Sequence, residues 1–156
     1  MAIEIERKFL VKGDRWRSLA EGMVYCQGYI PTKEGVTVRV RIAGDRGFLT
    51  IKGPSLGNAR AEFEYPVPVE DAREMLETLC ERPYIEKTRY KIPMGEFVWE
   101  VDEFAGDNQG LILAEVELTE EDQIVELPDW IGEEVSGDFR YFNSNLAKNP
   151  FSRWPK

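Results

Sequence analysis

Charged side chains occupy alternate positions at the start of the chain, where Glu4, Glu6 and Lys8 interleave with apolar residues. A spacing of two residues places all three side chains on one face of a β-strand. Carboxylates are oxygen ligands that suit Mg²⁺ or Mn²⁺, and a lysine is a point-charge partner for phosphate oxygens. The segment therefore predicts a strand with one charged face, which is a candidate binding face for a metal ion and a polyanion.

The same alternation recurs along most of the chain, and nearly every segment carries one sign of charge. A wet face of an antiparallel sheet also shows polar residues at alternate positions, and this simpler interpretation suffices for any single pair. Like charges about 7 Å apart cost roughly 0.6 kcal/mol in water and about 2.4 kcal/mol at an effective dielectric near 20. An oppositely charged ligand offsets such costs. The grouping of like charges on individual strands therefore favours a site for a metal–polyphosphate complex. The acidic pairs are Glu4/Glu6, Glu62/Glu64, Glu100/Asp102 and Glu115/Glu117, and the basic sets are Arg39/Arg41, Lys52 after Thr50, and Lys87/Arg89/Lys91.

Composition limits which chemistry is open to the chain. Its 156 residues contain no histidine, which excludes histidine bases, Ser-His-Asp triads and most zinc sites. The net charge of −9 disfavours nucleic acid and anionic membranes as partners. Cys26 and Cys80 lack CxxC spacing and are expected to be free thiols in a reducing compartment, and we expect a cytoplasmic protein.

Strand patterns dominate the elements that must position these side chains. We expect a mainly β, α+β fold in which eight antiparallel strands close into a barrel, with residues 1–156 forming a single domain. If the charges line a polar tunnel, the apolar residues must face outward against a few flanking helices and loops. The expected strands are 3–11, 23–30, 36–42, 48–52, 61–67, 86–92, 97–104 and 111–118, and the expected helices lie near 14–20, 70–81, 129–135 and 141–147.

Taken in order, these motifs resemble those of the CYTH superfamily, also called triphosphate tunnel metalloenzymes. The strings Ile5-Glu6-Arg7-Lys8-Phe9-Leu10 and Asn145-Leu146-Ala147-Lys148 are similar to its small single-domain bacterial branch. The resemblance covers essentially the whole chain. It implies a tunnel that holds a linear triphosphate lengthwise, with one or two Mg²⁺ or Mn²⁺ ions as cofactors.

The resemblance also implies a role for each group of charges. Phosphate oxygens would be bound by Lys8, Arg39, Arg41, Lys52, Lys87 and Arg89. The leading metal ligands would be Glu4, Glu6, Glu115 and Glu117. A second metal site, or the position of the attacking water, would be completed by Glu62, Glu64, Glu100 and Asp102, so that Asp102 is a catalytic candidate.

The expected activity is metal-dependent hydrolysis of inorganic tripolyphosphate to pyrophosphate and phosphate. Without histidine, the proton must go to a carboxylate, a metal-bound hydroxide or a lysine, and Lys8 and Lys87 are the candidate bases. Alternatives are an organic triphosphatase acting on thiamine triphosphate or a nucleotide, an adenylyl cyclase, and a non-catalytic polyphosphate- or nucleotide-binding module. Tyr25 and Tyr29 are aromatic residues that could contact an organic head group, so the organic substrates stay open as alternatives. The partner is a small-molecule triphosphate, and a homodimer is possible.

Overall fold

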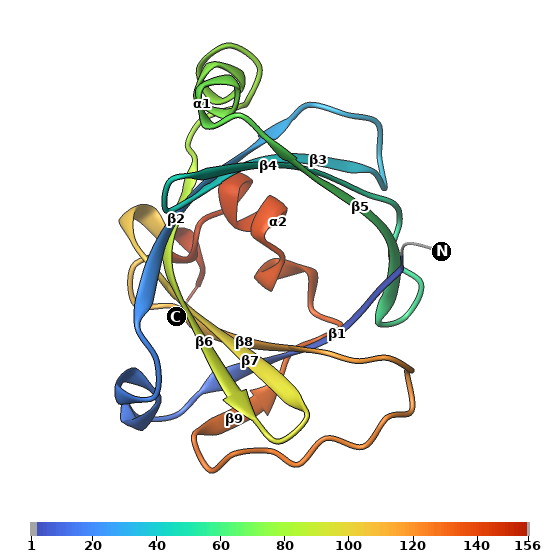
Figure 1. The fold of residues 1–156 in the computed structure, drawn as a ribbon, viewed down its shortest axis with the longest axis vertical. Coiled ribbons are helices and arrows are strands. Elements are labelled where there is room, and N and C mark those ends of the chain that lie inside the picture. The colour runs from blue at the N-terminus through green and yellow to red at the C-terminus, as the bar shows by residue number, and fades with distance from the viewer. Residues whose placement is uncertain (1–2, 156) are drawn as a thin grey trace.

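Eight antiparallel strands close into a barrel in the computed structural model, which describes residues 3–155 (Figure 1). Neighbours follow the order β5-β4-β3-β2-β6-β7-β8-β1, and pairing of β1 with β5 closes the ring. The prediction of a mainly β, eight-stranded closed barrel is therefore confirmed. The strands are β1 (Ile3–Val11), β2 (Gly22–Ile30), β3 (Thr37–Ala43), β4 (Arg46–Lys52), β5 (Ala59–Val67), β6 (Ile85–Met94), β7 (Phe97–Phe104) and β8 (Ile112–Glu117).

The barrel is lined by polar side chains and packs its apolar side chains on the outside. On β3, for example, Arg39 and Arg41 line a central cavity, while Val40 packs outward beneath helix α1 (Val69–Thr78). Helix α1 contributes Ala72 and Leu76 to this outer cluster. The helix approaches β4 so closely that a Cβ on Gly47 would lie 2.9 Å from Cβ of Ala72, which explains the glycine.

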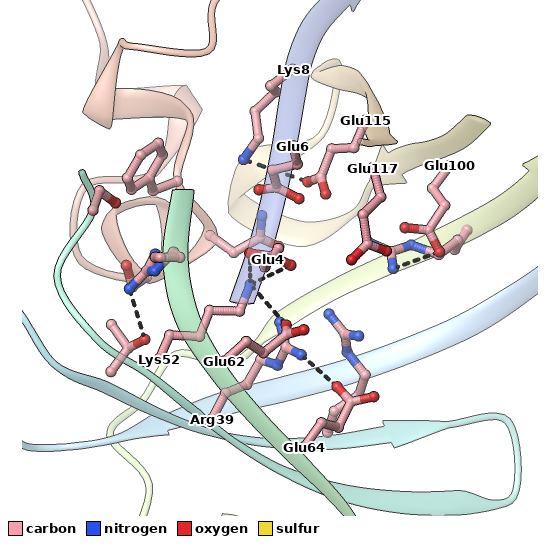
Figure 2. A pocket seen from close by; sticks show the side chains of 18 of the residues that line it. Glu4, Glu6, Lys8, Arg39, Lys52, Glu62, Glu64, Glu100, Glu115 and Glu117 are labelled. Carbon is pink, nitrogen blue, oxygen red and sulfur yellow. Dashed lines mark hydrogen bonds and ion pairs between the residues drawn. The ribbon is translucent and has the colours of Figure 1, made fainter. Parts of the chain in front are cut away.

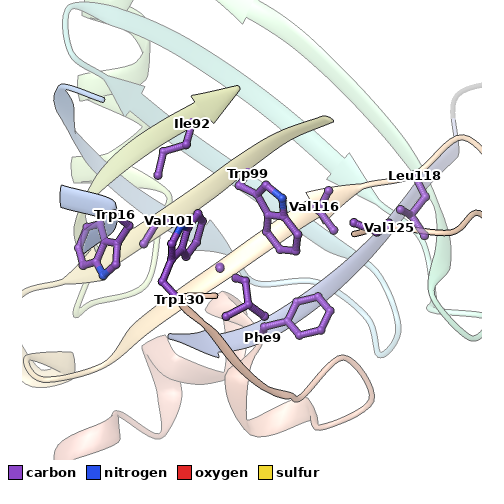
Figure 3. Packing of buried hydrophobic residues seen from close by; sticks show 11 residues of the cluster. Phe9, Trp16, Ile92, Trp99, Val101, Val116, Leu118, Val125 and Trp130 are labelled. Atoms are coloured by element: carbon purple, nitrogen blue, oxygen red, sulfur yellow. The ribbon is translucent and has the colours of Figure 1, made fainter. Parts of the chain in front are cut away.

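The largest apolar cluster covers the outer wall formed by β1, β7 and β8 (Figure 3). The indole of Trp99 lies between the rings of Phe9, at 5.6 Å, and Trp130, at 6.0 Å, in edge-to-face contacts. Two further elements cover this wall: the 3₁₀ turn η1 (Arg15–Ser18), through Trp16, and the short strand β9 (Ile131–Glu134), which pairs with β1. This cluster anchors the three strands that carry most of the acidic side chains of the lumen.

The chain after β9 folds back across one end of the barrel. Helix α2 (Asn143–Lys148) lies within the ring of strands when the molecule is viewed along the bore (Figure 1). Its Leu146 is fully buried against Ile85 and Leu113 of the barrel wall. The adjoining 3₁₀ turns are η3 (Phe139–Tyr141) and η4 (Phe151–Arg153), and η2 (Gly106–Asn108) connects β7 to β8. One end of the lumen is thus closed by the C-terminal segment.

The structure corrects two of the expected helices. The helix predicted near 129–135 is wrong, because this segment forms β9, whose residues pair with Phe9 and Val11 of β1. The helix predicted near 14–20 is only the turn η1. The expected helices at 70–81 and 141–147 correspond to α1 and α2. Among the described residues, no helix has the length and apolar character needed to cross a membrane.

Candidate active site

The charged side chains converge on a cavity of about 260 Å³ inside the barrel (Figure 2). Nearly all side chains singled out from the sequence line it. Asp102 is the exception, because it lies behind the lining and is only 1% exposed. The lining residues that were expected are Glu4, Glu6, Lys8, Arg39, Arg41, Lys52, Glu62, Glu64, Lys87, Arg89, Lys91, Glu100, Glu115 and Glu117.

Strand pairing places many charges directly opposite a charge of the other sign. Lys52 on β4 lies opposite Glu62 on β5, and its Nζ is 2.9 Å from Oε1 of Glu4. Lys8 on β1 lies opposite Glu115 on β8, with 3.5 Å between Nζ and Oε1. Like charges along each strand are therefore partly balanced by the neighbouring strand.

The acidic wall formed by β1, β8 and β7 is less well balanced. Glu6 lies opposite Glu117, and Glu100 lies opposite Glu115. Burial raises the pKa of Glu6 well above its usual range, and repulsion by Glu115 and Glu4 adds to the effect. Burial likewise raises the pKa of Glu117, with Glu4 and Glu100 contributing. A cation between these carboxylates would relieve the repulsion.

The donor chemistry of this wall fits Mg²⁺ or Mn²⁺. Its ligands are all carboxylate oxygens, the donors that these hard cations prefer. Within residues 3–155, however, no three acidic or cysteine side chains form a ready-made cage for an ion. This agrees with the usual behaviour of Mg²⁺ beside phosphates, where one or two carboxylates bind it and substrate oxygens and waters fill the remaining positions. The residues that would hold the metal are Glu4, Glu6, Glu115 and Glu117.

A cationic wall of buried guanidinium groups faces the same cavity. The ring of Tyr25 lies against two of these groups, with 4.8 Å from its centroid to Cζ of Arg41 and 5.0 Å to Cζ of Arg89. Burial lowers the pKa of Arg41, and the nearby Arg39 and Arg89 lower it further, which is the effect of crowded positive charges. Such a group of cations is stabilised by an anion with several oxygens.

Arg39 supplies a second indication that an anion binds here. Its terminal nitrogen Nη2 donates to Thr50 Oγ1 at 3.1 Å and to Glu64 Oε2 at 3.3 Å. Its Nε is the only buried side-chain nitrogen or oxygen without a hydrogen-bond partner in the described part of the chain. Because leaving a buried donor unpaired is costly, this atom indicates a place for an acceptor such as a phosphate oxygen.

Asp102 holds two of the cations in place. Its carboxylate accepts two hydrogen bonds from Arg89, at 2.7 and 2.8 Å, and lies 2.7 Å from Nζ of Lys87. Burial would raise the pKa of Asp102, but Arg89 and Lys87 outweigh it and lower the pKa to about 2. The carboxylate is therefore ionised at neutral pH, and both of its oxygens are already bound to cations.

The two candidate lysine bases differ in their surroundings. Burial lowers the pKa of Lys87 to about 7, because Arg89 and Arg41 offset much of the stabilisation by Asp102. The pKa of Lys8 is raised instead, since Glu115 and Glu6 outweigh the effect of its burial. A lysine with a pKa near neutrality has an unprotonated fraction that can accept a proton, so this geometry favours Lys87 as the base.

Three uncharged residues contact the charged side chains of the site in ways that the sequence did not predict. Gln27 is fully buried, and its Oε1 accepts from Nε of Arg41 at 2.7 Å. Asn143 of α2 accepts at Oδ1 from Nζ of Lys87 at 2.8 Å. Tyr25 provides the ring between the arginines. The alternation of Tyr25 and Gln27 on β2 was the available signal, whereas nothing in the sequence pattern placed Asn143 at the lumen.

Comparison with known proteins identifies similar sequences that match nearly the whole chain. Residues 2–149 match the model of the CYTH domain family. A protein of Acetivibrio thermocellus named inorganic triphosphatase is 54% identical over 154 residues, which is 99% of each chain. A second protein of that name, from Nitrosomonas europaea, is 40% identical over 92% of this chain and 96% of its own.

A solved structure supports the same relationship at the level of the fold. A crystal structure described as that of an inorganic triphosphatase is 36% identical and superposes with a TM-score of 0.65. The match covers 92% of this chain and 96% of that one. The similarity therefore spans the barrel and the site together.

Proposed function

From the premise that this chain belongs to the CYTH domain family, we propose that it is an inorganic triphosphatase that hydrolyses tripolyphosphate to pyrophosphate and phosphate. The relative that is 54% identical along nearly its entire length carries this name. The observation in the molecule that most strongly supports the proposal is that one cavity brings together a wall rich in carboxylates and a group of crowded guanidinium groups. A linear triphosphate with its metal ion requires both.

The cationic residues bind and orient the substrate. Arg39, Arg41 and Arg89 offer planar guanidinium groups to phosphate oxygens, and Lys8 and Lys52 add point charges. Burial strengthens each of these interactions, because the effective dielectric around a buried group is lower than in bulk water. Fixed cations also stabilise the negative charge that develops on the transferred phosphoryl group and the leaving pyrophosphate.

On the acidic wall, Glu4, Glu6, Glu115 and Glu117 would hold the divalent cation. When bound, Mg²⁺ or Mn²⁺ supplies charge neutralisation and Lewis acidity at the phosphate oxygens. Glu62, Glu64 and Glu100 line the cavity and are available to position water or a second ion. Asp102 acts through its contacts with Arg89 and Lys87, which makes it a positioning residue in this proposal.

The attacking water loses its proton to Nζ of Lys87. Its burial supports this role, because burial, helped by the nearby Arg89 and Arg41, lowers the pKa of the ammonium group to about 7. Hydrolysis by direct attack of water needs no covalent intermediate with the protein.

An organic head group has little support in this geometry. The ring of Tyr25 is 4% exposed and lies against Arg41 and Arg89, so it has no free face for a purine or thiamine ring. The hydroxyl of Tyr29 accepts a hydrogen bond from Gln27 at 3.1 Å.

The cytoplasmic location, the homodimer and the absence of a nucleic-acid partner remain predictions.

Phosphate release from tripolyphosphate, ATP and thiamine triphosphate, each with Mg²⁺, Mn²⁺ and Ca²⁺, tests the proposal. We expect the highest kcat/KM for tripolyphosphate with Mg²⁺ or Mn²⁺, and loss of release when the metal is chelated. A higher kcat/KM for either organic substrate would favour an organic triphosphatase. Tight binding of tripolyphosphate without release under any condition would favour a binding module.

A further inference from the structure

Helix α2 contributes polar side chains to the closed end of the cavity. Asn143, its first residue, lines the cavity together with Lys8 and Lys87. The same C-terminal segment contacts Lys8, whose Nζ donates to the carbonyl of Tyr141 at 3.2 Å and lies 5.2 Å from the centre of the Phe142 ring. The end of the tunnel is therefore built from α2 and the two lysines.

Hydrogen bonds fix which way the amide of Asn143 points. Arg41 has only donors, so the oxygen of Gln27 must face it, which leaves the nitrogen of Gln27 to donate to Oδ1 of Asn143 at 3.2 Å. From the other side, Nζ of Lys87 donates to the same Oδ1 at 2.8 Å. Two donors thus hold the oxygen of the Asn143 amide toward the cavity wall.

This arrangement leaves the amide nitrogen of Asn143 free to donate. Within residues 3–155, no acceptor forms a hydrogen bond with its Nδ2. Two serines, Ser136 and Ser144, line the same cavity. In the part of the chain that the structure describes, no carboxylate pairs with the amide, whereas Lys8 and Lys52 each have a carboxylate partner.

We propose that Asn143 is a substrate-binding residue whose side-chain amide donates a hydrogen bond to the terminal phosphate of the triphosphate at the closed end of the tunnel. The inference rests on the proposed function and deepens it by naming the residue that recognises the end of the chain. A terminal phosphate has one more oxygen free for hydrogen bonds than an internal one. A donor at the closed end, beside Lys8 and Lys87, therefore distinguishes the end of a polyphosphate from its middle.

Two substitutions of Asn143 separate this role from a structural one. Asn143→Asp keeps an oxygen that can accept from Lys87 and Gln27 but replaces the amide donor with a second, negatively charged oxygen. Asn143→Ala removes both functions. Ser144→Asp is the matched control, because it places a carboxylate on the neighbouring residue that also lines the cavity.

The measurement is the dissociation constant of tripolyphosphate by calorimetry in the presence of a metal chelator, so that hydrolysis does not interfere. We expect Asn143→Ala to weaken binding about 10-fold and Asn143→Asp about 100-fold, following the cost of removing a hydrogen bond to a charged group and of adding repulsion. The loss for Asn143→Asp should exceed the loss for Ser144→Asp. Thermal unfolding without ligand reports whether each variant is folded.

Three results would overturn the proposal. Binding by Asn143→Asp equal to that of the wild type, with Asn143→Ala weaker, would show that Asn143 only holds Lys87 and Gln27. Equal losses in Asn143→Asp and Ser144→Asp would indicate general repulsion, and unchanged binding by Asn143→Ala would show no contact. If the wild type neither binds nor hydrolyses tripolyphosphate, the proposed function itself fails, which is a separate outcome.

Discussion

Replacing Glu6 with glutamine should stabilise the metal-free protein while removing activity. Burial and the neighbouring Glu115 and Glu4 raise the pKa of Glu6, so its ionised form opposes folding. Glutamine has nearly the same shape and carries no charge, so it removes the repulsion by Glu115 and Glu4.

The size of the effect follows from the charges around Glu6. Two ionised carboxylates about 4 Å apart repel each other by about 4 kcal/mol at an effective dielectric near 20. Attraction to Lys8 and protonation of Glu6 itself offset part of this repulsion. We therefore expect Glu6→Gln to raise the free energy of unfolding by about 1–2 kcal/mol, which corresponds to a rise of about 3–6 °C in Tm for a domain of this size.

Thermal unfolding at pH 8 with a chelator measures this change. A folded-state pKa above the unfolded value means that ionisation costs stability as pH rises through this window. The gain should therefore be present at pH 8 and vanish below about pH 4.5, where Glu6 is protonated in both states. Glu134→Gln is the matched control: hydrogen bonds from Arg7 lower the pKa of Glu134 at the surface, so this change should cost up to about 1 kcal/mol.

A lower Tm for Glu6→Gln than for the wild type at pH 8 would refute the reasoning. It would mean that the ionised Glu6 is stabilised by its neighbours, so that the acidic wall has no excess of negative charge for a metal to neutralise. Full hydrolytic activity in Glu6→Gln would contradict its role as a metal ligand.

Substitutions at three further residues test the cationic wall. Asp102→Asn should lower the free energy of unfolding in urea by about 3–5 kcal/mol, because Arg89 and Lys87 lose a buried counter-ion, and a loss below 1 kcal/mol would contradict this. Lys87→Arg keeps the positive charge, but arginine has no neutral form near pH 7 that could accept a proton. We therefore expect kcat to fall and the rise in kcat/KM near pH 7 to disappear. An unchanged pH profile would exclude Lys87 as the base. Tyr25→Leu should raise KM for tripolyphosphate about 10-fold, because Arg41 and Arg89 lose the aromatic ring that they contact. Tyr25→Phe keeps the ring and should match the wild type. Equal effects of the two substitutions would contradict the role of the ring.

The sequence predicted the barrel and most of the lumen because alternation fixes which side chains share a face. On β3, the arginines had to oppose Val40, and a row of buried apolar residues outside the barrel needed a cover, which α1 provides. The thiols were also predicted correctly: Cys26 and Cys80 are free and pack in the cluster beneath α1.

Features that depend on contacts between distant segments could not be predicted. The spacing of Ile131 and Val135 is typical of a helix, but β9 forms because its backbone pairs with β1. The pairing of Asp102 with Arg89 follows from the register of β6 and β7, which alternation alone does not set. The location of Asn143 depends on how α2 folds across the bore, and no local pattern reports it.

A crystal structure with imidotriphosphate, a non-hydrolysable analogue, and Mn²⁺ tests the central claim most directly. We predict that the analogue lies lengthwise in the barrel lumen, with its oxygens on Arg39, Arg41 and Arg89. Anomalous scattering from Mn²⁺ should place the ion beside Glu6 and Glu115. An analogue bound outside the barrel, or a manganese ion away from the acidic wall, would contradict the account.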